Sequence, residues 1–224
     1  MPAYRSPAEG EIRDAVVNQA RRWRPGARIL HEVNILDGRN RVDLMLVDRS
    51  ELTLVEIKSE RDKLDRLSDQ VNAMRRCAHH TAVALHRKFM PPVEDTRAPR
   101  IEGLHHDVLH WWYPTAQDMA EAHHPAFTWR EPDLSSSLQI PLPNDALGIL
   151  WRDELLDLCH ALAVPVGKRP NMRELIASLR WQRSAGIITK GICWALRRRE
   201  SLEADAAIDE PAPRLSAAHE GAGK

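Results

Sequence analysis

The sequence predicts an α/β fold of the α+β kind, in which helices cover a sheet. Two observations support this prediction. Segments with alternating or continuous apolar residues follow one another at 28–36, 41–48, 52–58 and 81–85, which is the pattern of strands. Capping residues and apolar residues at helical spacing stand before the first of these segments and after the third.

The first helix is expected to begin after Ser6 and to end at Arg24-Pro25-Gly26. The run Ser6-Pro7-Ala8-Glu9 is a capping box with proline at the first helical position. Its apolar stripe consists of Ile12, Val16, Ala20 and Trp23. The strand that follows carries Glu32, and an Asp37-Gly38 turn leads from it into the next strand.

A hairpin is expected at residues 41–58, because two apolar segments there flank the polar turn Asp48-Arg49-Ser50-Glu51. If the turn is centred between its second and third residues, Asp43 lies opposite Glu56. Side chains of a strand alternate between two faces, so Lys58 is expected on the face that carries both acids. The hairpin therefore predicts two carboxylates and an ammonium group side by side.

Two opposed carboxylates repel each other unless a cation lies between them or one keeps its proton. Mg²⁺ prefers hard oxygen ligands and would satisfy both Asp43 and Glu56. Arg41, opposite Lys58, is expected either to contact a substrate phosphate or to pair with an acid, and the sequence leaves both open. The structural alternative is an ordinary polar pair of acids on an exposed sheet face.

An Asp on one strand and Glu-x-Lys on the next, here Asp43 and Glu56-Ile57-Lys58, resembles the catalytic signature of the PD-(D/E)XK, or restriction-endonuclease-like, nuclease superfamily. The run EIKSERDKLDRLSDQV at 56–71 and LGILWRDELLDL at 147–158 are similar to a bacterial and phage branch of it. The resemblance extends over most of residues 8–200. It implies a restriction-endonuclease-like core with a mixed central sheet flanked by helices, and metal-dependent hydrolysis of phosphodiester bonds.

The resemblance also implies roles for individual residues. Asp43 and Glu56 would hold one or two Mg²⁺ ions, for which Mn²⁺ can substitute, with the backbone carbonyl of Ile57 as a further ligand. Lys58 would orient the attacking water and neutralise the oxyanion. Glu32 would be an auxiliary catalytic metal ligand, and the alternative is a solvated glutamate on an edge strand.

A second helix is expected directly after Lys58, where Ser59 and Asp62 form another capping pattern. Arg66 and Gln70 are four residues apart, so they share a face that can contact nucleic acid near the acids. In related nucleases a Tyr follows the Gln by four residues, and its absence here weakens the prediction for Gln70. For Arg66 the alternative is an exposed helix arginine.

After residue 86 the prolines break any long element, and residues 108–113, with Trp111-Trp112, are expected to close the sheet. A C-terminal helical appendage then follows the core. The predicted divisions are a nuclease-like core at 1–143, a basic helical subdomain at 144–200 and a disordered tail at 201–224.

Between residues 168 and 199 basic residues far outnumber the single acid, Glu174. Such a local excess predicts phosphate contacts, and Lys168, Arg169 and Arg173 are the residues assigned to them. The alternative is a helix face that docks on the core. Two tryptophans of this region, Trp181 and Trp194, are expected to pack rather than to stack on bases.

Composition narrows the class of protein. The chain of 224 residues has 32 Lys and Arg and 32 Asp and Glu, so net charge gives no argument for nucleic acid. Three distant cysteines predict buried thiols in a reducing cytoplasm, and no apolar run reaches the roughly 18 residues that span a bilayer. The histidine pairs lack the spacing of a structural zinc site; they are His79-His80, His105-His106 and His123-His124.

The sequence therefore predicts a cytoplasmic, metal-dependent nuclease that makes no membrane contact. Its predicted partner is a nucleic acid, with DNA favoured and RNA left open, and a homodimer is also left open. The competing class is a nucleic-acid-binding or regulatory module with a nuclease-like fold and weak or no catalysis.

Overall fold

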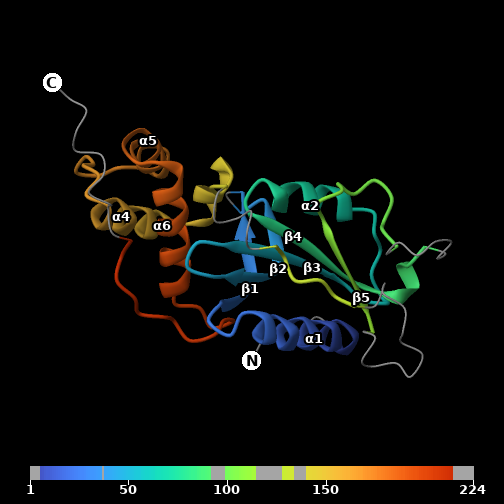
Figure 1. Ribbon diagram of the computed structural model, residues 1–224. Coiled ribbons are helices and arrows are strands. Elements are labelled where there is room, and N and C mark those ends of the chain that lie inside the picture. Colours follow the sequence, from blue (N-terminus) through green and yellow to red (C-terminus); the bar gives the residue numbers. More distant parts are fainter. Residues whose placement is uncertain (1–5, 37, 92–98, 115–127, 134–139, 214–224) are drawn as a thin grey trace.

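The computed structural model describes residues 6–36, 38–91, 99–114, 128–133 and 140–213. Its centre is a five-stranded mixed sheet with helices on both faces (Figure 1). The predicted α/β class with a mixed central sheet is confirmed. The strands stand in chain order and are β1 (Arg28–Ile35), β2 (Asn40–Val47), β3 (Leu52–Lys58), β4 (His80–His86) and β5 (Leu109–Tyr113).

Strand direction changes in the middle of the sheet. β1, β2 and β3 pair antiparallel, as the short turns between them require, whereas β4 is parallel to β3 and β5 is parallel to β4. The parallel pairing of β3 and β4 needs a crossover, which is supplied by helix α2 (Leu67–Arg75).

The registers place three acids in one row across the sheet. In the β2–β3 hairpin Leu44 pairs with Val55, which is the predicted register and puts Asp43 next to Glu56 just beyond the last pair. In the β1–β2 pair His31 faces Leu44, and the same register puts Glu32 opposite Asp43.

Helix α1 (Pro7–Trp23) covers one face of the sheet. The Ser6 hydroxyl oxygen accepts a hydrogen bond from the Glu9 amide at 3.2 Å, so the predicted helix start is confirmed. The stripe of α1 packs on apolar residues of the sheet. That cluster includes Ile12, Val16, Ala20, Leu44, Val55, Ile57 and Trp111.

Helix α2 lies on the opposite face and is shorter than expected. The Ser59 hydroxyl donates to Asp62 Oδ2 at 2.6 Å, and the Ser59 amide donates to the same oxygen at 2.8 Å. These bonds close a tight turn at the end of β3 instead of capping a helix. Residues 59–66 therefore form a loop, and the helix begins at Leu67.

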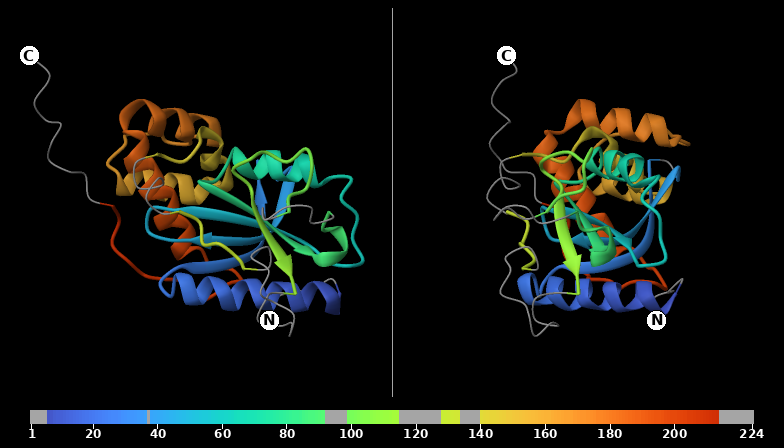
Figure 2. Two further views of the ribbon diagram at one scale, coloured as in Figure 1. Left: turned by 45° about the vertical axis from the view of Figure 1, so that its right-hand side comes forward. Right: turned by 90° about the vertical axis from the view of Figure 1, so that its right-hand side faces the viewer.

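The C-terminal helices pack beside α2, against the β1 and β2 part of the sheet (Figures 1 and 2). They are α4 (Arg152–Ala161), α5 (Met172–Gln182) and α6 (Ala185–Arg198), preceded by the 3-10 helix η4 (Asn144–Ile149). A shorter 3-10 helix, η1 (Arg87–Phe89), follows β4. One hydrophobic cluster joins Leu147, Leu158 and Ile192 to Leu30 and Met45 of the sheet, so both parts share a core.

Much of the basic excess in this region is structural. Buried Arg197 donates to the carbonyl oxygens of Gly26 and Val47 and pairs with Glu210 at 2.7 Å. Buried Arg199 pairs with Glu154 at 2.6 Å. Arg197 fixes the end of helix α6 to the sheet, and Arg199 fixes it to α4, so the docking alternative holds for these two residues.

The chain beyond residue 200 was predicted to be disordered, whereas the structure places residues 203–205 against β1. The His31 amide donates to the Glu203 carbonyl at 2.8 Å, and the Asp205 amide donates to the Ile29 carbonyl at 2.9 Å. This segment pairs with β1 at the open edge of the sheet. An edge strand has backbone N–H and C=O groups without partners, and the composition of the tail gave no sign that it would supply them. Residues 214–224 of the predicted tail lie outside the described part.

Trp181 and Trp194, the two tryptophans that were expected to pack, differ in exposure. Trp194 is 9% exposed and donates its indole N–H to the Glu210 carbonyl at 2.9 Å, which confirms the packing prediction. Trp181 is 90% exposed, so the packing prediction for this residue is wrong.

All three cysteines are buried. None of the helices in the described segments combines the length and apolar character that crossing a bilayer requires.

Candidate active site

A cavity of about 550 Å³ opens where β3 ends. Its walls come from α1, β2, β3, the loop 59–66 and α2. Most of the residues assigned to the site from the sequence line it together: Arg41, Asp43, Glu56, Ile57, Lys58, Arg66 and Gln70. Glu9 also lines it, and sequence reasoning had not assigned it to the site.

Glu56, Lys58 and Gln70 form a connected triad. Lys58 Nζ lies 2.7 Å from Glu56 Oε1 and 3.0 Å from Gln70 Oε1, and the Gln70 amide nitrogen donates to the same Glu56 oxygen. The Glu56 side chain is only 4% exposed. Gln70 of α2 therefore fixes both the carboxylate and the ammonium group of β3.

Asp43 is held by different partners. Its Oδ2 accepts a hydrogen bond from the Ile57 amide at 2.7 Å, which ties β2 to β3 beyond the last ladder pair. Its Oδ1 lies 3.5 Å from Arg13 Nη2, and its carbonyl oxygen accepts from Arg13 Nη1 at 2.7 Å. Asp43 is therefore contacted by a side chain of α1.

Arg13 is the centre of an acidic cluster that sequence reasoning missed. Its Nη2 lies 2.6 Å from Glu9 Oε1 and 2.8 Å from Glu32 Oε1, and its side chain is fully buried. Glu9, Glu32 and Asp43 offer oxygens that all lie within 4.8 Å of one another. The available signal was the Glu9–Arg13 pair, four residues apart and beside the apolar stripe of α1.

A backbone irregularity turns the acids toward α1. Glu32 has φ of 54°, a left-handed conformation that costs a non-glycine residue of order 1 kcal/mol. Ile29 packs on the α1 side and Leu30 on the other, but Val33 lies with Leu30, so the alternation of β1 changes at Glu32. Such strain is common at functional sites.

The same change occurs in β2, where Leu44 packs on the α1 side but Val42 lies with Met45 on the other. The structure here differs from the predicted common face. Glu56 and Lys58 share a face with α2, whereas Asp43 is turned to α1, and both sets open into the same cavity.

Electrostatics single out Asp43. Burial first, and the charge of Glu56 second, raise the pKa of its carboxyl to about 7, while the Ile57 amide and Arg13 oppose the shift. The carboxyl therefore takes up or loses its proton near neutral pH. A cation bound at this position would favour the ionised form.

The mouth of the cavity carries cations together with the loop acids Asp62 and Asp65. Arg41 Nε lies 2.9 Å from Glu32 Oε2, so of the two alternatives the structure has the acid pair. Arg66 is exposed at the rim, and the loop adds Arg61 and Lys63, which the sequence had not singled out.

The remaining assigned residues lie elsewhere. Lys168 and Arg169 are exposed between α4 and α5 and do not line this cavity, and Arg173 lines another. Within the described residues, one cluster of three or more acids, cysteines or histidines is arranged so that it could hold a metal ion. It consists of Glu9, Glu32 and Asp43 and contains no histidine. His123 and His124 lie outside the described residues.

A family model described as bacteriophage P4 protein cII matches residues 3–104. The matched segment is slightly under half of the chain and runs from α1 through β4, so it contains the acids, Lys58 and Gln70. No curated protein and no solved structure matches the chain.

Proposed function

We propose that this protein is a metal-dependent nuclease with a restriction-endonuclease-like core, and that it hydrolyses phosphodiester bonds, with DNA as the favoured substrate. The observation that carries the proposal is that Asp43, Glu56 and Lys58 line one cavity. The antiparallel hairpin, the crossover helix and the parallel strand agree with the core that the resemblance implies.

The donor set fits a hard divalent cation. The carboxylate oxygens of Glu9, Glu32 and Asp43 lie close enough together to share an ion, and Glu56 stands beside Asp43. These residues would hold Mg²⁺ or Mn²⁺, with the Ile57 carbonyl as a further ligand. When bound, the ion supplies a water of lowered pKa and offsets charge on the phosphate.

Lys58 would act on the reacting phosphate. Its ammonium group is fixed by Glu56 and Gln70 inside the cavity, and a compact positive charge there can orient an attacking water and stabilise a developing oxyanion. Arg66 at the rim, with the neighbouring loop cations, would hold the phosphates of the strand. Arg41 would hold the Glu32 carboxylate in position through their ion pair.

One observation favours the competing class, a nucleic-acid-binding or regulatory module with weak or no catalysis. The Arg13 guanidinium already contacts Glu9, Glu32 and Asp43. A fixed internal cation therefore does part of the neutralising that a metal would do. In this case the cavity would bind nucleic acid without cutting it.

The deciding experiment measures nicking of supercoiled DNA, and cleavage of single-stranded DNA and RNA, with Mg²⁺, Mn²⁺ or EDTA. We expect metal-dependent cleavage that falls by more than about 100-fold in Asp43→Asn and in Lys58→Met. Asp153→Asn is the matched control, because the Asp153 side chain is 88% exposed and lies outside the cavity. Circular dichroism would confirm that each variant is folded.

Two outcomes would reject the nuclease. Wild-type protein that binds DNA but cuts nothing with either metal would establish the binding module instead. Cleavage that survives unchanged in both folded variants would place the activity elsewhere or in a contaminant.

A further inference from the structure

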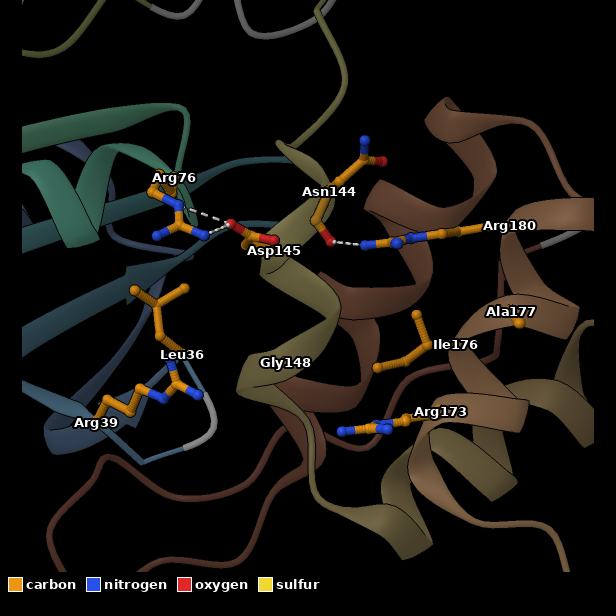
Figure 3. Close-up of a pocket in the computed structure, with 10 residues that line it drawn as sticks. All are labelled: Leu36, Arg39, Arg76, Asn144, Asp145, Gly148, Arg173, Ile176, Ala177 and Arg180. Carbon is orange, nitrogen blue, oxygen red and sulfur yellow. Dashed lines mark hydrogen bonds and ion pairs between the residues drawn. The ribbon is translucent and has the colours of Figure 1, made fainter.

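A second cavity, of about 350 Å³, lies between the β1–β2 turn, η4 and α5 (Figure 3). Its volume is at the lower end of the roughly 300–1,000 Å³ typical of small-ligand sites. Four arginines line it and Asp145 is the one acid among its described lining residues. The arginines are Arg39, Arg76, Arg173 and Arg180.

The four arginines are not equally engaged. Arg76 lies 2.6 Å from Asp145 Oδ2, and Arg180 donates to the Asn144 carbonyl at 2.6 Å. The side chains of Arg39 and Arg173 have no ion-pair or hydrogen-bond partner within the part of the chain that the structure describes. Both are exposed.

Figure 3 shows Arg39 reaching from the β1–β2 turn and Arg173 reaching from α5 into the space between them. Two like charges that converge on one space repel each other, and an anion between them removes that repulsion. A guanidinium group is the side chain best suited to phosphate, because its N–H donors match two phosphate oxygens. The cavity therefore fits a phosphate group.

Trp181 is an apolar side chain of the same helix, although it does not itself line the cavity. It follows Arg180 directly and stands four residues after Ala177, which lines the cavity, so it is the neighbour of Ala177 at the edge of the cavity-lining side of α5. Its 90% exposure is unusual for so large an apolar side chain. An exposed indole beside phosphate-binding cations is the arrangement on which unpaired bases stack.

We propose that this face of α5 binds a single-stranded segment of nucleic acid, with a phosphate between Arg39 and Arg173 and a base on Trp181. A single strand is required because bases in a duplex do not offer their faces to a side chain. The choice of nucleic acid rests on the proposed function, and this inference deepens it by naming the form of the strand that the protein holds.

The test measures fluorescence anisotropy of a labelled single-stranded oligodeoxynucleotide of about 12 nucleotides, in EDTA so that nothing is cut. We expect Kd to rise about tenfold in the double variant Arg39→Gln/Arg173→Gln, and the slope of log affinity against log salt to fall by about 0.7, the value for one lost phosphate contact. Trp181→Ala should also raise Kd about tenfold. Arg130→Gln is the control, because Arg130 is exposed and lines neither cavity.

Two further ligands separate the sources of binding. An oligonucleotide with abasic sites should bind equally to wild type and to Trp181→Ala, since stacking is then lost in both. A duplex of the same length should bind more weakly than the single strand and should be insensitive to Trp181→Ala.

The proposal is overturned if the double variant binds the single strand as tightly as Arg130→Gln does, or if pyrophosphate binds at the arginines while the oligonucleotide does not. Asp43→Asn should bind the strand normally in EDTA. Loss of cleavage and loss of strand binding are therefore measured separately, and a failed nuclease assay leaves this test intact.

Discussion

The Arg13 guanidinium joins helix α1 to Asp43 of β2, because its Nη1 donates to the Asp43 carbonyl oxygen at 2.7 Å and its Nη2 lies 3.5 Å from Asp43 Oδ1. The same Nη2 contacts Glu9 and Glu32. The Arg13 side chain is fully buried, so its charge depends on these acids for compensation, and theirs depends on it. One side chain thus supports both the fold and the acidic half of the site.

Arg13→Ala should lower the free energy of unfolding by about 3–5 kcal/mol, because it leaves buried carboxylates without their cation. Urea denaturation at pH 7 measures the loss. Arg21→Ala is the matched control on the same helix, since the Arg21 side chain is 57% exposed, pairs with Asp205 at the surface, and should cost less than about 1 kcal/mol. Equal costs for the two variants would show that the Arg13 cluster does not stabilise the fold.

The raised pKa of Asp43 predicts how stability depends on pH. Burial first, and the charge of Glu56 second, raise the pKa in the folded protein to about 7, against about 3.9 when unfolded. Between these values the folded state holds a proton that the unfolded state has lost. The contribution of Asp43 to stability is therefore fully present below pH 4, falls as pH rises from about 4 to about 7, and is constant above.

Asp43→Asn isolates this contribution, because the amide resembles the protonated acid and its oxygen can still accept from the Ile57 amide. Unfolding free energies of wild type and variant should differ little near pH 4, and the variant should gain on wild type up to about pH 7. The comparison is made in EDTA to exclude bound metal. A difference that does not vary with pH would contradict the raised pKa.

Local sequence signals predicted the framework well. The hairpin register follows from a short polar turn between two apolar segments, so the proximity of Asp43 and Glu56 could be predicted from the sequence alone. The start of α1 follows from Ser6 and Pro7 in the same way. In both cases the determining contacts lie within a few residues along the chain.

The features that the sequence did not predict depend on contacts between segments that are distant along the chain. The left-handed conformation of Glu32 carries no residue signature, and it lies where the side-chain alternation of β1 changes. Glu9 and Arg13 are an ordinary helical pair until β1 and β2 cover them. Ser59 and Asp62 match a helix-capping pattern, but in the structure their hydrogen bond closes a turn in the loop 59–66 beside the cavity.

The segment 201–213 should stabilise the edge of β1 through Asp205. Its Oδ2 accepts from the Ile29 amide at 3.0 Å, so Asp205→Ala leaves a buried donor without a partner and should cost about 1–3 kcal/mol. Asp209→Ala is the matched control, because the Asp209 side chain is 94% exposed and should cost less than about 0.5 kcal/mol. Thermal unfolding of both variants checks this, and an unchanged Tm for Asp205→Ala would mean that the segment is not fixed there.

The Glu56, Lys58 and Gln70 triad predicts that the side-chain amide of Gln70 affects the cleavage rate by positioning Lys58, without contacting the substrate. Gln70→Ala removes an acceptor from Lys58 and a donor from Glu56, so the ammonium group keeps its pair with Glu56 but loses the second contact that fixes its position. Cleavage should fall between about 10- and 100-fold, because small displacements of a reacting group are costly in rate. Strand binding in EDTA should change little.

Asn72→Ala is the control for this variant, since Asn72 is an exposed amide on the same helix. The turnover number should fall in Gln70→Ala while KM stays near that of wild type, because the lost contacts position Lys58 and do not hold the strand. A merely structural role for Gln70 would instead lower Tm and leave the turnover of the folded fraction unchanged. If Gln70→Ala cuts DNA as fast as Asn72→Ala, Lys58 does not depend on Gln70 for its position.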